Sequence, residues 1–326
     1  MRLLVLGGTR FVGRHVVEAA LARGDELTLF NRARSAPDLF EGIELLRGDR
    51  GGDLDALRRG GPWDAAIDLS GYELPHVAAS SRALADRVEH LTFVSTIAVY
   101  AGCPAGGIDE RAPLARFDGD GETYGPNKAL CEQAVQATLP GRALVVRPGV
   151  IAGPHDPTNR FTWWVSRLAR GGRVLAPGAP DRPVQIIDAR DLAVWMLDMV
   201  TRRATGVFNA VGPQAPLTME GLLRACRPDA ELVWVTDEQL LAAGVQPGDG
   251  LPLWLPASDS RRVSLMRIDG SRAFGAGLRL RPLPETARDV LASLRIAGEP
   301  PESDRARRAT GLDPALEARL LTRGPR

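Results

Sequence analysis

The stretch Leu3-Leu4-Val5-Leu6-Gly7-Gly8-Thr9-Arg10-Phe11-Val12-Gly13 decides the fold of this 326-residue chain. Its first four residues form a continuous apolar run, which is typical of a parallel strand buried on both faces. Apolar residues then recur at helical spacing up to Gly24, a natural helix stop: Val16, Val17, Ala20 and Leu21. The stretch therefore predicts a strand, a glycine turn and a helix.

A strand, a glycine turn and a helix in this order favour dinucleotide binding. Gly7 would permit the tight turn, and Gly13 would let the helix approach the strand. The helix N-terminus would then face a pyrophosphate. The contacts predicted from this segment are Gly7, Thr9, Arg10, Phe11, Val12 and Gly13.

The end of the next strand, expected at residues 26–30, distinguishes between two nicotinamide cofactors. Sites for NAD place an acidic residue there to accept from the ribose 2′-OH, whereas sites for NADP offer arginine to the 2′-phosphate. Here the strand leads into Asn31-Arg32-Ala33-Arg34, without a carboxylate. We therefore expect NADP(H) in preference to NAD(H), with contacts from Asn31, Arg32, Arg34 and Arg10. The alternative is that these arginines are solvated loop charges.

Further strands are expected at residues 43–47, 65–69 and 91–95, each separated from the next by a helical stretch. This alternation predicts an α/β fold with a doubly wound parallel sheet, the Rossmann arrangement. Ligands of such sheets lie beyond the carboxyl ends of the strands. Polar residues gather at those ends: Asp49, Ser70 and the pair Ser95-Thr96.

Lys128 is the only lysine among 41 basic residues, and it follows Tyr124 by four positions. A free tyrosine has a pKa of about 10, and a nearby ammonium favours the phenolate, which brings proton transfer into range at neutral pH. The alternative interpretation is an exposed helix lysine beside a surface tyrosine.

These features resemble the extended short-chain dehydrogenase/reductases, also described as the NAD-dependent epimerase/dehydratase family, over residues 1–212. The phrases that carry the resemblance are Phe93 to Tyr100, Tyr124 to Lys128, Arg147 to Pro154 and Gln185 to Leu192. The resemblance implies that Thr96 orients the substrate oxygen and that Tyr124 exchanges the proton. It implies that Lys128 binds the nicotinamide ribose and lowers the pKa of the tyrosine. Further cofactor contacts implied by it are Asp49, Arg50, Leu69, Ser70, Gly71, Ser95, Pro148, Val150 and Ile151.

The sequence departs from the family pattern at three places, and two of them bear on the reaction and the substrate. Arg10 replaces the middle glycine, as in a subgroup beginning Gly-Gly-Thr-Arg-Phe that includes chloroplast stem-loop RNA-binding proteins. Ile97-Ala98 stands where sugar dehydratases carry Asp-Glu, which argues against dehydration. Val184 stands where nucleotide-sugar epimerases place an arginine, and Arg182 is two positions away, so a nucleotide sugar is not favoured.

The predicted Rossmann domain comprises residues 1–155 and 184–212, and a substrate lobe comprises 156–183 and 213–298. Residues 299–326 form a charged tail with one helix at 314–322 and a small arginine cluster at 305–308. Trp163, Trp164, Trp234 and Trp254 are interpreted as core packing, with an apolar pocket wall as the alternative. His155, Asn159 and Arg160 would face the substrate or cap a loop, and Cys103 would lie near the pocket or simply be buried.

Composition sets limits on partners and location. A net charge of +1 offers no electrostatic case for nucleic acid or an anionic membrane. Three cysteines without a C-x-x-C spacing indicate a reducing, cytoplasmic environment. Four scattered histidines predict no metal site, and no apolar run is long enough to span a membrane.

The leading hypothesis is an NADP(H)-dependent oxidoreductase that acts on a small carbonyl or alcohol through Thr96, Tyr124 and Lys128. One alternative is an epimerase that retains its nicotinamide cofactor. Another is a cofactor-sensing or RNA-associated binding protein without catalysis, against which the intact Thr96, Tyr124 and Lys128 argue. The resemblance further implies a homodimer.

Overall fold

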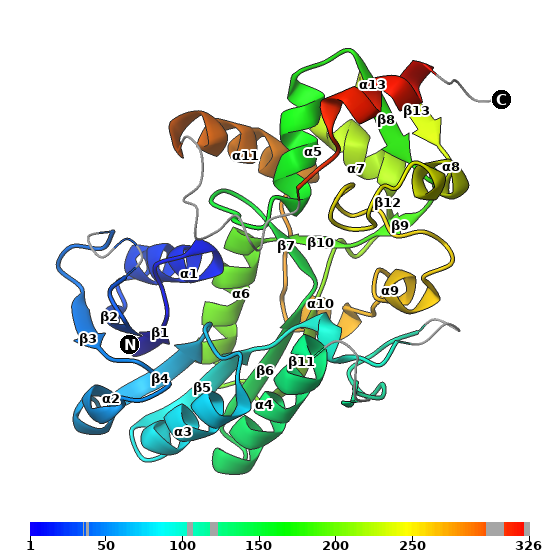
Figure 1. Cartoon of the computed structure of the whole chain (residues 1–326). Helices are drawn as coiled ribbons and strands as arrows, with labels where there is room; N and C mark the ends of the chain where they lie inside the picture. The colour runs from blue at the N-terminus through cyan, green and yellow to red at the C-terminus, as the bar shows by residue number, and fades with distance from the viewer. Residues whose placement is uncertain (35, 37–38, 103–106, 118–122, 298–309, 323–326) are drawn as a thin grey trace.

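The computed structural model describes all residues except 35, 37–38, 103–106, 118–122, 298–309 and 323–326. Its centre is a seven-stranded parallel sheet in the order β11-β6-β5-β4-β1-β2-β3 (Figure 1). The strands are β1 (Arg2–Leu6), β2 (Glu26–Asn31), β3 (Glu44–Arg47), β4 (Trp63–Asp68), β5 (Val88–Val94), β6 (Ala143–Pro148) and β11 (Gly206–Ala210). From β1, the strands β2 and β3 are added on one side of the sheet, and β4, β5, β6 and β11 are added on the other side. This change of side between β1 and β4 confirms the doubly wound Rossmann arrangement and marks the expected ligand position.

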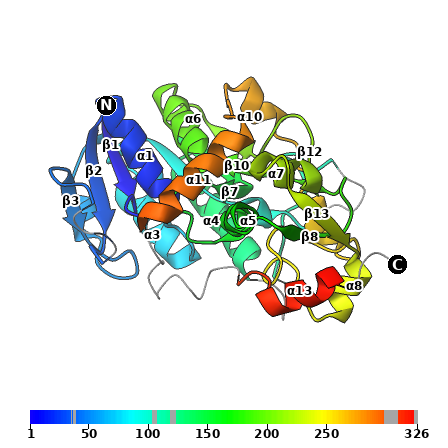
Figure 2. The ribbon, with the colours of Figure 1, turned by 90° about the horizontal axis from the view of Figure 1, so that it is seen from above.

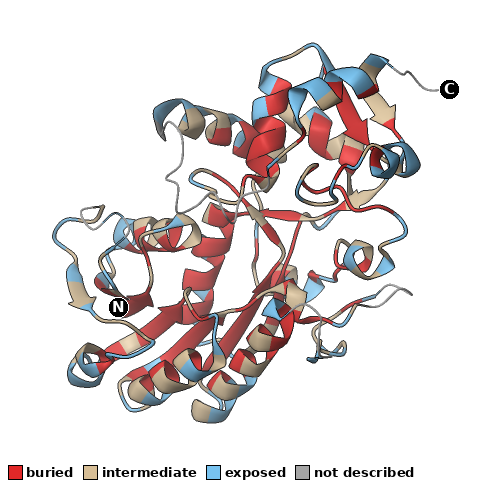
Figure 3. Cartoon of the chain, in the orientation of Figure 1, coloured by how far each residue is buried: buried red, intermediate tan, exposed pale blue. Residues whose placement is uncertain are grey.

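Helices cover both faces of this sheet. Helices α1 (Phe11–Ala22) and α6 (Ala189–Thr201) pack on one face, and α2 (Asp55–Arg59), α3 (Leu74–Leu84) and α4 (Tyr124–Thr138) pack on the other. Within β1, Leu3 and Val5 join the first core while Leu4 and Leu6 join the second. This two-sided burial explains the unbroken apolar run in the sequence. Apart from the edge strand β3, the strands of the sheet are buried along most of their length (Figure 3).

A second group of elements has its own hydrophobic core, set off from the central sheet (Figures 1 and 2). It is built around the two-stranded sheet β8 (Arg173–Pro177) and β13 (Glu231–Val235). We call this group the lobe; its helices are α5 (Arg160–Ala169), α7 (Met219–Cys226), α8 (Asp237–Ala242), α11 (Leu283–Ala297) and α13 (Pro314–Thr322). Short connecting elements are η1 (Ile97–Val99), β7 (Val150–Ala152), β9 (Pro183–Val184), β10 (Ile186–Asp188), β12 (Leu217–Thr218), α9 (Ser260–Ser264) and α10 (Ser271–Gly275).

The tryptophans of the lobe are core residues, as the sequence indicated. Trp164 and Trp254 are fully buried, Trp163 is nearly so, and Trp234 packs partly buried against the same core. The indole N–H of Trp164 donates to the Pro252 carbonyl (2.6 Å), and that of Trp254 donates to Asp237 (2.8 Å). Buried indoles need such acceptors, so these rings stabilise the lobe rather than line an open pocket.

Helix α13 spans the predicted residues and docks into the lobe. Glu317 forms a buried ion pair with Arg167 of α5 (2.7 Å) and also accepts from the Leu175 N–H (3.2 Å). Gly311 approaches the Trp163 indole so closely that a Cβ there would lie 2.0 Å from its nitrogen. The predicted arginine cluster at 305–308 and Cys103 lie outside the described residues.

None of the helices in the described part of the chain combines the length and apolarity that crossing a bilayer requires.

Candidate active site

The glycine turn after β1 has the close approach that its sequence predicts. Gly7 and Gly8 have φ values of 110° and 92°, a region that favours glycine. A Cβ on Gly13 would lie 2.9 Å from both Cα and N of Gly8, so only glycine lets α1 start this close to the turn. Thr9 and Arg10 complete the turn, and Phe11 and Val12 begin the helix.

The first turn of α1 suits an anion. Within residues 10–14, all of which are described, no side chain caps the helix and no acidic residue is present. The N–H groups and dipole of a helix N-terminus favour a phosphate group. The site residues therefore fit the pyrophosphate of a dinucleotide.

Arginines surround the carboxyl ends of β2 and β3. Asn31 at the end of β2 donates to the Gly7 carbonyl (3.1 Å) and accepts from the Ala33 N–H (2.7 Å), which fixes the chain there. Arg32 and Arg34 are exposed, and Arg32 lies 3.9 Å from the Asp49 carboxylate. The Gly51 N–H lowers the pKa of Asp49 most, and Arg32, Arg34 and His76 lower it further.

Arg50 is engaged within the protein. Its guanidinium donates to both oxygens of the buried Asp68 (3.0 and 2.7 Å) and to the Ser80 hydroxyl (2.9 Å). Ser70, which follows Leu69 after β4, donates to the Leu6 carbonyl (3.2 Å). These contacts fix the edge of the sheet, and a direct role of Arg50 and Ser70 in cofactor binding stays a prediction.

Thr96 and Tyr124 lie on adjoining elements. The Thr96 hydroxyl accepts from the Ala98 N–H (3.2 Å) and so caps η1, which leaves its O–H to donate. Tyr124 is the first residue of α4 and is 40% exposed. A Cβ on Gly125 would lie 2.2 Å from the Ala98 carbonyl oxygen, so α4 begins directly against η1. Ser95 is buried, and its hydroxyl has no partner among the described residues.

Lys128 lies one helical turn after Tyr124, at the carboxyl ends of β4 and β5. Its Nζ donates to the carbonyls of Gly71 (2.6 Å) and Val94 (2.7 Å), and the residue is only 2% exposed. Burial lowers the pKa of Lys128 to about 8, against the opposing attraction of Asp68. Gly71 is required here because a Cβ would lie 2.7 Å from Phe93 and from Val77.

Tyr72, which the sequence analysis missed, lies beside both members of this pair. Its ring centroid is 6.5 Å from that of Tyr124 and 5.6 Å from the Lys128 Nζ. The available signal was composition, because the chain has only three tyrosines and two of them follow predicted ligand-binding segments.

A buried polar network anchors α4 beneath the site. Arg147 of β6 donates to both carboxylate oxygens of Glu132 on α4 (2.6 Å at the shortest) and to the Tyr100 hydroxyl (2.8 Å). The Tyr100 hydroxyl donates in turn to Asn209 of β11 (2.6 Å). Burial raises the pKa of Tyr100. The network connects β6, β11, the end of η1 and the helix that carries Tyr124.

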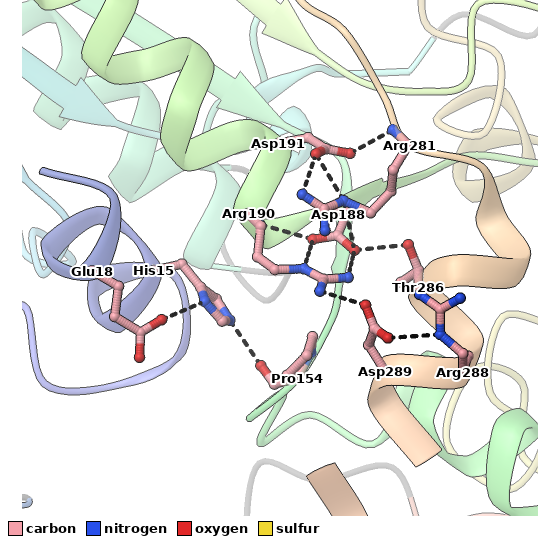
Figure 4. A network of polar contacts seen from close by, with 10 residues as sticks. All are labelled: His15, Glu18, Pro154, Asp188, Arg190, Asp191, Arg281, Thr286, Arg288 and Asp289. Atoms are coloured by element: carbon pink, nitrogen blue, oxygen red, sulfur yellow. Dashed lines mark hydrogen bonds and ion pairs between the residues drawn. The ribbon is translucent and has the colours of Figure 1, made fainter. Parts of the chain in front are cut away.

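The nicotinamide end predicted from the sequence maps to the transition from the sheet to the lobe. Pro148 ends β6, and Val150 and Ile151 lie in β7, which pairs with β10. Near this transition His15 of α1 hydrogen-bonds to the Pro154 carbonyl (3.0 Å; Figure 4). His155 is exposed, Asn159 directly precedes α5, and Arg160 donates to Thr158 (3.1 Å).

A second polar network joins α6 to α11 and the segment before it (Figure 4). Asp188 caps α6 through the Arg190 N–H (2.8 Å) and accepts from the Thr286 hydroxyl (2.7 Å). Asp191 accepts from the guanidinium of Arg281 (2.7 Å). The aspartate of the strand-to-helix element is thus structural in this chain.

Arg182 is not presented as a diphosphate ligand. Its guanidinium pairs with Asp237 of α8 (2.9 Å) and donates to the Leu255 carbonyl. Val184 is buried. Both observations agree with the sequence argument against a nucleotide-sugar substrate.

Comparison with known proteins shows which family the sequence is similar to. The model of the NAD dependent epimerase/dehydratase family matches residues 72–210. The chloroplast stem-loop binding protein of 41 kDa b from Arabidopsis thaliana is 26% identical over 71% of this chain and 65% of its own length. A 2-alkyl-3-oxoalkanoate reductase from Shewanella oneidensis is 27% identical over 67% of this chain and 63% of its own length. The chain spans less than two thirds of these two relatives.

Among solved structures, human epimerase family protein SDR39U1 with NADPH is similar in fold. The TM-score is 0.61 at 22% identity, and the match covers 89% of this chain and 100% of the human one. The sheet order, the glycine turn and these matches agree with one another. Residues 72–210 are thus similar to the NAD dependent epimerase/dehydratase family, and the chain shares its fold with the human structure.

Proposed function

We propose that this protein is an NADP(H)-dependent oxidoreductase that interconverts a small carbonyl compound and its alcohol at Thr96, Tyr124 and Lys128. The observation that carries the proposal is the position of the only lysine. Its ammonium is buried at the carboxyl edge of the sheet, one turn from a tyrosine that is partly exposed at the same edge.

The three side chains have separate tasks in this proposal. Thr96 donates its O–H to the substrate oxygen, while one of its two lone pairs accepts from the Ala98 N–H and fixes the hydroxyl in place. Tyr124 donates the proton that the oxygen gains on reduction. Lys128 carries the charge that favours the tyrosine's phenolate form and so assists proton release. A bound nicotinamide supplies or accepts the hydride in this chemistry.

The choice of NADP(H) is supported by the charges around β2. Exposed Arg32 and Arg34 follow the strand, and both act on Asp49, so their charges converge near the expected 2′-position. No acidic residue ends β2, where an NAD site would need one. The structure of the human relative was obtained with NADPH.

A carbonyl substrate is supported by the relatives and by what the site lacks. One relative is named a 2-alkyl-3-oxoalkanoate reductase. Within η1, which is fully described, Ile97 and Ala98 offer no acid or base for eliminating water.

The substitution Tyr124→Phe tests this proposal. We expect the variant to bind NADPH as the wild type does, measured by the change in nucleotide fluorescence on titration. We expect it to lose turnover in a panel of ketones and aldehydes followed by NADPH absorbance. An active Tyr124→Phe enzyme would refute the assigned role, and tighter binding of NADH would refute the cofactor.

Two other functions have specific support. The matched family model includes epimerases, and an epimerase would carry nucleotide through purification and consume no NADPH overall. The Arabidopsis relative is named a stem-loop binding protein, so retention of this chain on stem-loop RNA at physiological salt would favour an RNA-associated role.

A further inference from the structure

The Lys128 ammonium lies in a cage with one wall at the protein surface. The cage consists of the Gly71 and Val94 carbonyls and the rings of Phe93 and Tyr72. The Phe93 centroid is 4.1 Å from Nζ, and this ring is fully buried. The Tyr72 centroid is 5.6 Å away, and Tyr72 is 46% exposed. Tyr72 therefore forms the solvent side of the cage.

Tyr72 also contacts the reactive phenol. Its ring and that of Tyr124 have centroids 6.5 Å apart and planes tilted by 36°. This separation lies within the range of favourable aromatic pairs. Tyr72 is thus the one residue after β4 whose ring adjoins both Tyr124 and Lys128.

Tyr72 lies outside the hydrophobic cores of the protein. The residue belongs to none of the four hydrophobic clusters formed by the described residues. Removing its ring therefore opens no core cavity, so a loss of activity would not reflect unfolding.

We propose that Tyr72 is a positioning residue for proton transfer: its ring restricts the orientation of the Tyr124 phenol and keeps water from the Lys128 ammonium. The catalytic part of this inference rests on the proposed function. The exclusion of water does not, because it concerns only the state of Lys128.

The charges around Lys128 predict the direction of the change when Tyr72 is removed. Burial is the largest influence on the pKa of Lys128 and lowers it. At 5.6 Å the Tyr72 ring is near the limit of about 6 Å for cation–π attraction, so losing that attraction matters less than admitting water. The pKa should therefore rise from about 8. The other charged and titratable groups that act on this amine are Asp68 of β4, Arg50 before α2, and Cys131 and Glu132 of α4.

The test compares Tyr72→Leu with Tyr72→Phe, which keeps the ring. Because the chain has a single lysine, protein labelled with ¹³C-lysine gives the side-chain resonances of Lys128 alone. We expect an NMR pH titration to show a higher pKa in Tyr72→Leu and the wild-type value in Tyr72→Phe. With the carbonyl substrate, we expect kcat to fall about tenfold in Tyr72→Leu, with the NADPH Kd unchanged and the alkaline limb of the kcat profile moved to higher pH.

The outcomes separate the two proposals. If the wild type reduces no carbonyl, the proposed function fails, and the lysine titration still tests the exclusion of water. If Tyr72→Leu leaves the Lys128 pKa at the wild-type value and kcat within twofold of wild type, the inference is overturned. A Tyr72→Phe enzyme as impaired as Tyr72→Leu would overturn the role of the ring and point to the hydroxyl.

Discussion

Gly125 offers the most direct test of how the fold positions the reactive residues. An added Cβ would lie 2.2 Å from the Ala98 oxygen, whereas real Cβ contacts stay beyond 3.0 Å. In Gly125→Ala, α4 and η1 must therefore separate by about 1 Å, since the Ala98 oxygen belongs to the backbone and the new Cβ is fixed to the backbone of α4. Because η1 is capped by Thr96 and α4 begins with Tyr124, this shift separates the two groups that, in the proposed function, bind one substrate oxygen.

A displacement of about 1 Å at a reacting pair costs on the order of 100-fold in rate. We expect Gly125→Ala to lose about 100-fold in kcat, measured by NADPH consumption, while its NADPH Kd stays at the wild-type value because the glycine turn is untouched. The matched control is Gly275→Ala in α10, where an added Cβ meets no atom within 4 Å. A Gly125→Ala enzyme with turnover within threefold of the wild type would refute the claim that this contact sets the geometry.

Three further predictions address the network, the cofactor and pH. Replacing Arg147 by Met leaves Glu132 buried and unpaired, and we expect the free energy of unfolding, measured in urea, to fall by about 3–5 kcal/mol. The double variant Arg147→Met with Glu132→Leu should recover much of this loss. An additive loss in the double variant would contradict the pairing. Removing both Arg32 and Arg34 as alanines should weaken NADPH binding about tenfold or more and leave NADH binding nearly unchanged, which titration of both nucleotides would measure. Burial lowers the folded-state pKa of Lys128, so its charge is lost as pH rises through about 8; kcat should fall over that range, and a rate that keeps rising to pH 10 would argue against a role for the ammonium.

The glycine turn and α1 could be predicted because their signals are local. Gly7, Gly13 and the apolar spacing of the following helix are contiguous in sequence. The helix at residues 314–322 was predicted for the same reason. The placement of Tyr124 and Lys128 one helical turn apart needed only their spacing in the sequence.

Contacts between distant segments could not be predicted in this way. Nothing local in the sequence marks Glu132 and Arg147 as partners, and only the packing of α4 on β6 makes them a buried pair. Tyr72 gains its contacts with Tyr124 and Lys128 because the segment after β4 lies beside the start of α4. Arg182 looked close to a ligand-binding position, but its partner Asp237 comes from a separate helix of the lobe.

The docking of α13 has a consequence for synthesis of the chain. Arg167 of α5 pairs with Glu317, which the ribosome adds 150 residues later, and Leu312 and Leu320 complete the same core. The Rossmann strands precede most of the lobe in sequence and pack around separate clusters, so they can assemble while translation continues. Until α13 is made, the Arg167 guanidinium has no Glu317 to pair with, and part of the apolar core of the lobe stays exposed to solvent. We therefore expect nascent chains stalled before residue 312 to hold NADPH-binding structure while still recruiting chaperones through the unfinished lobe.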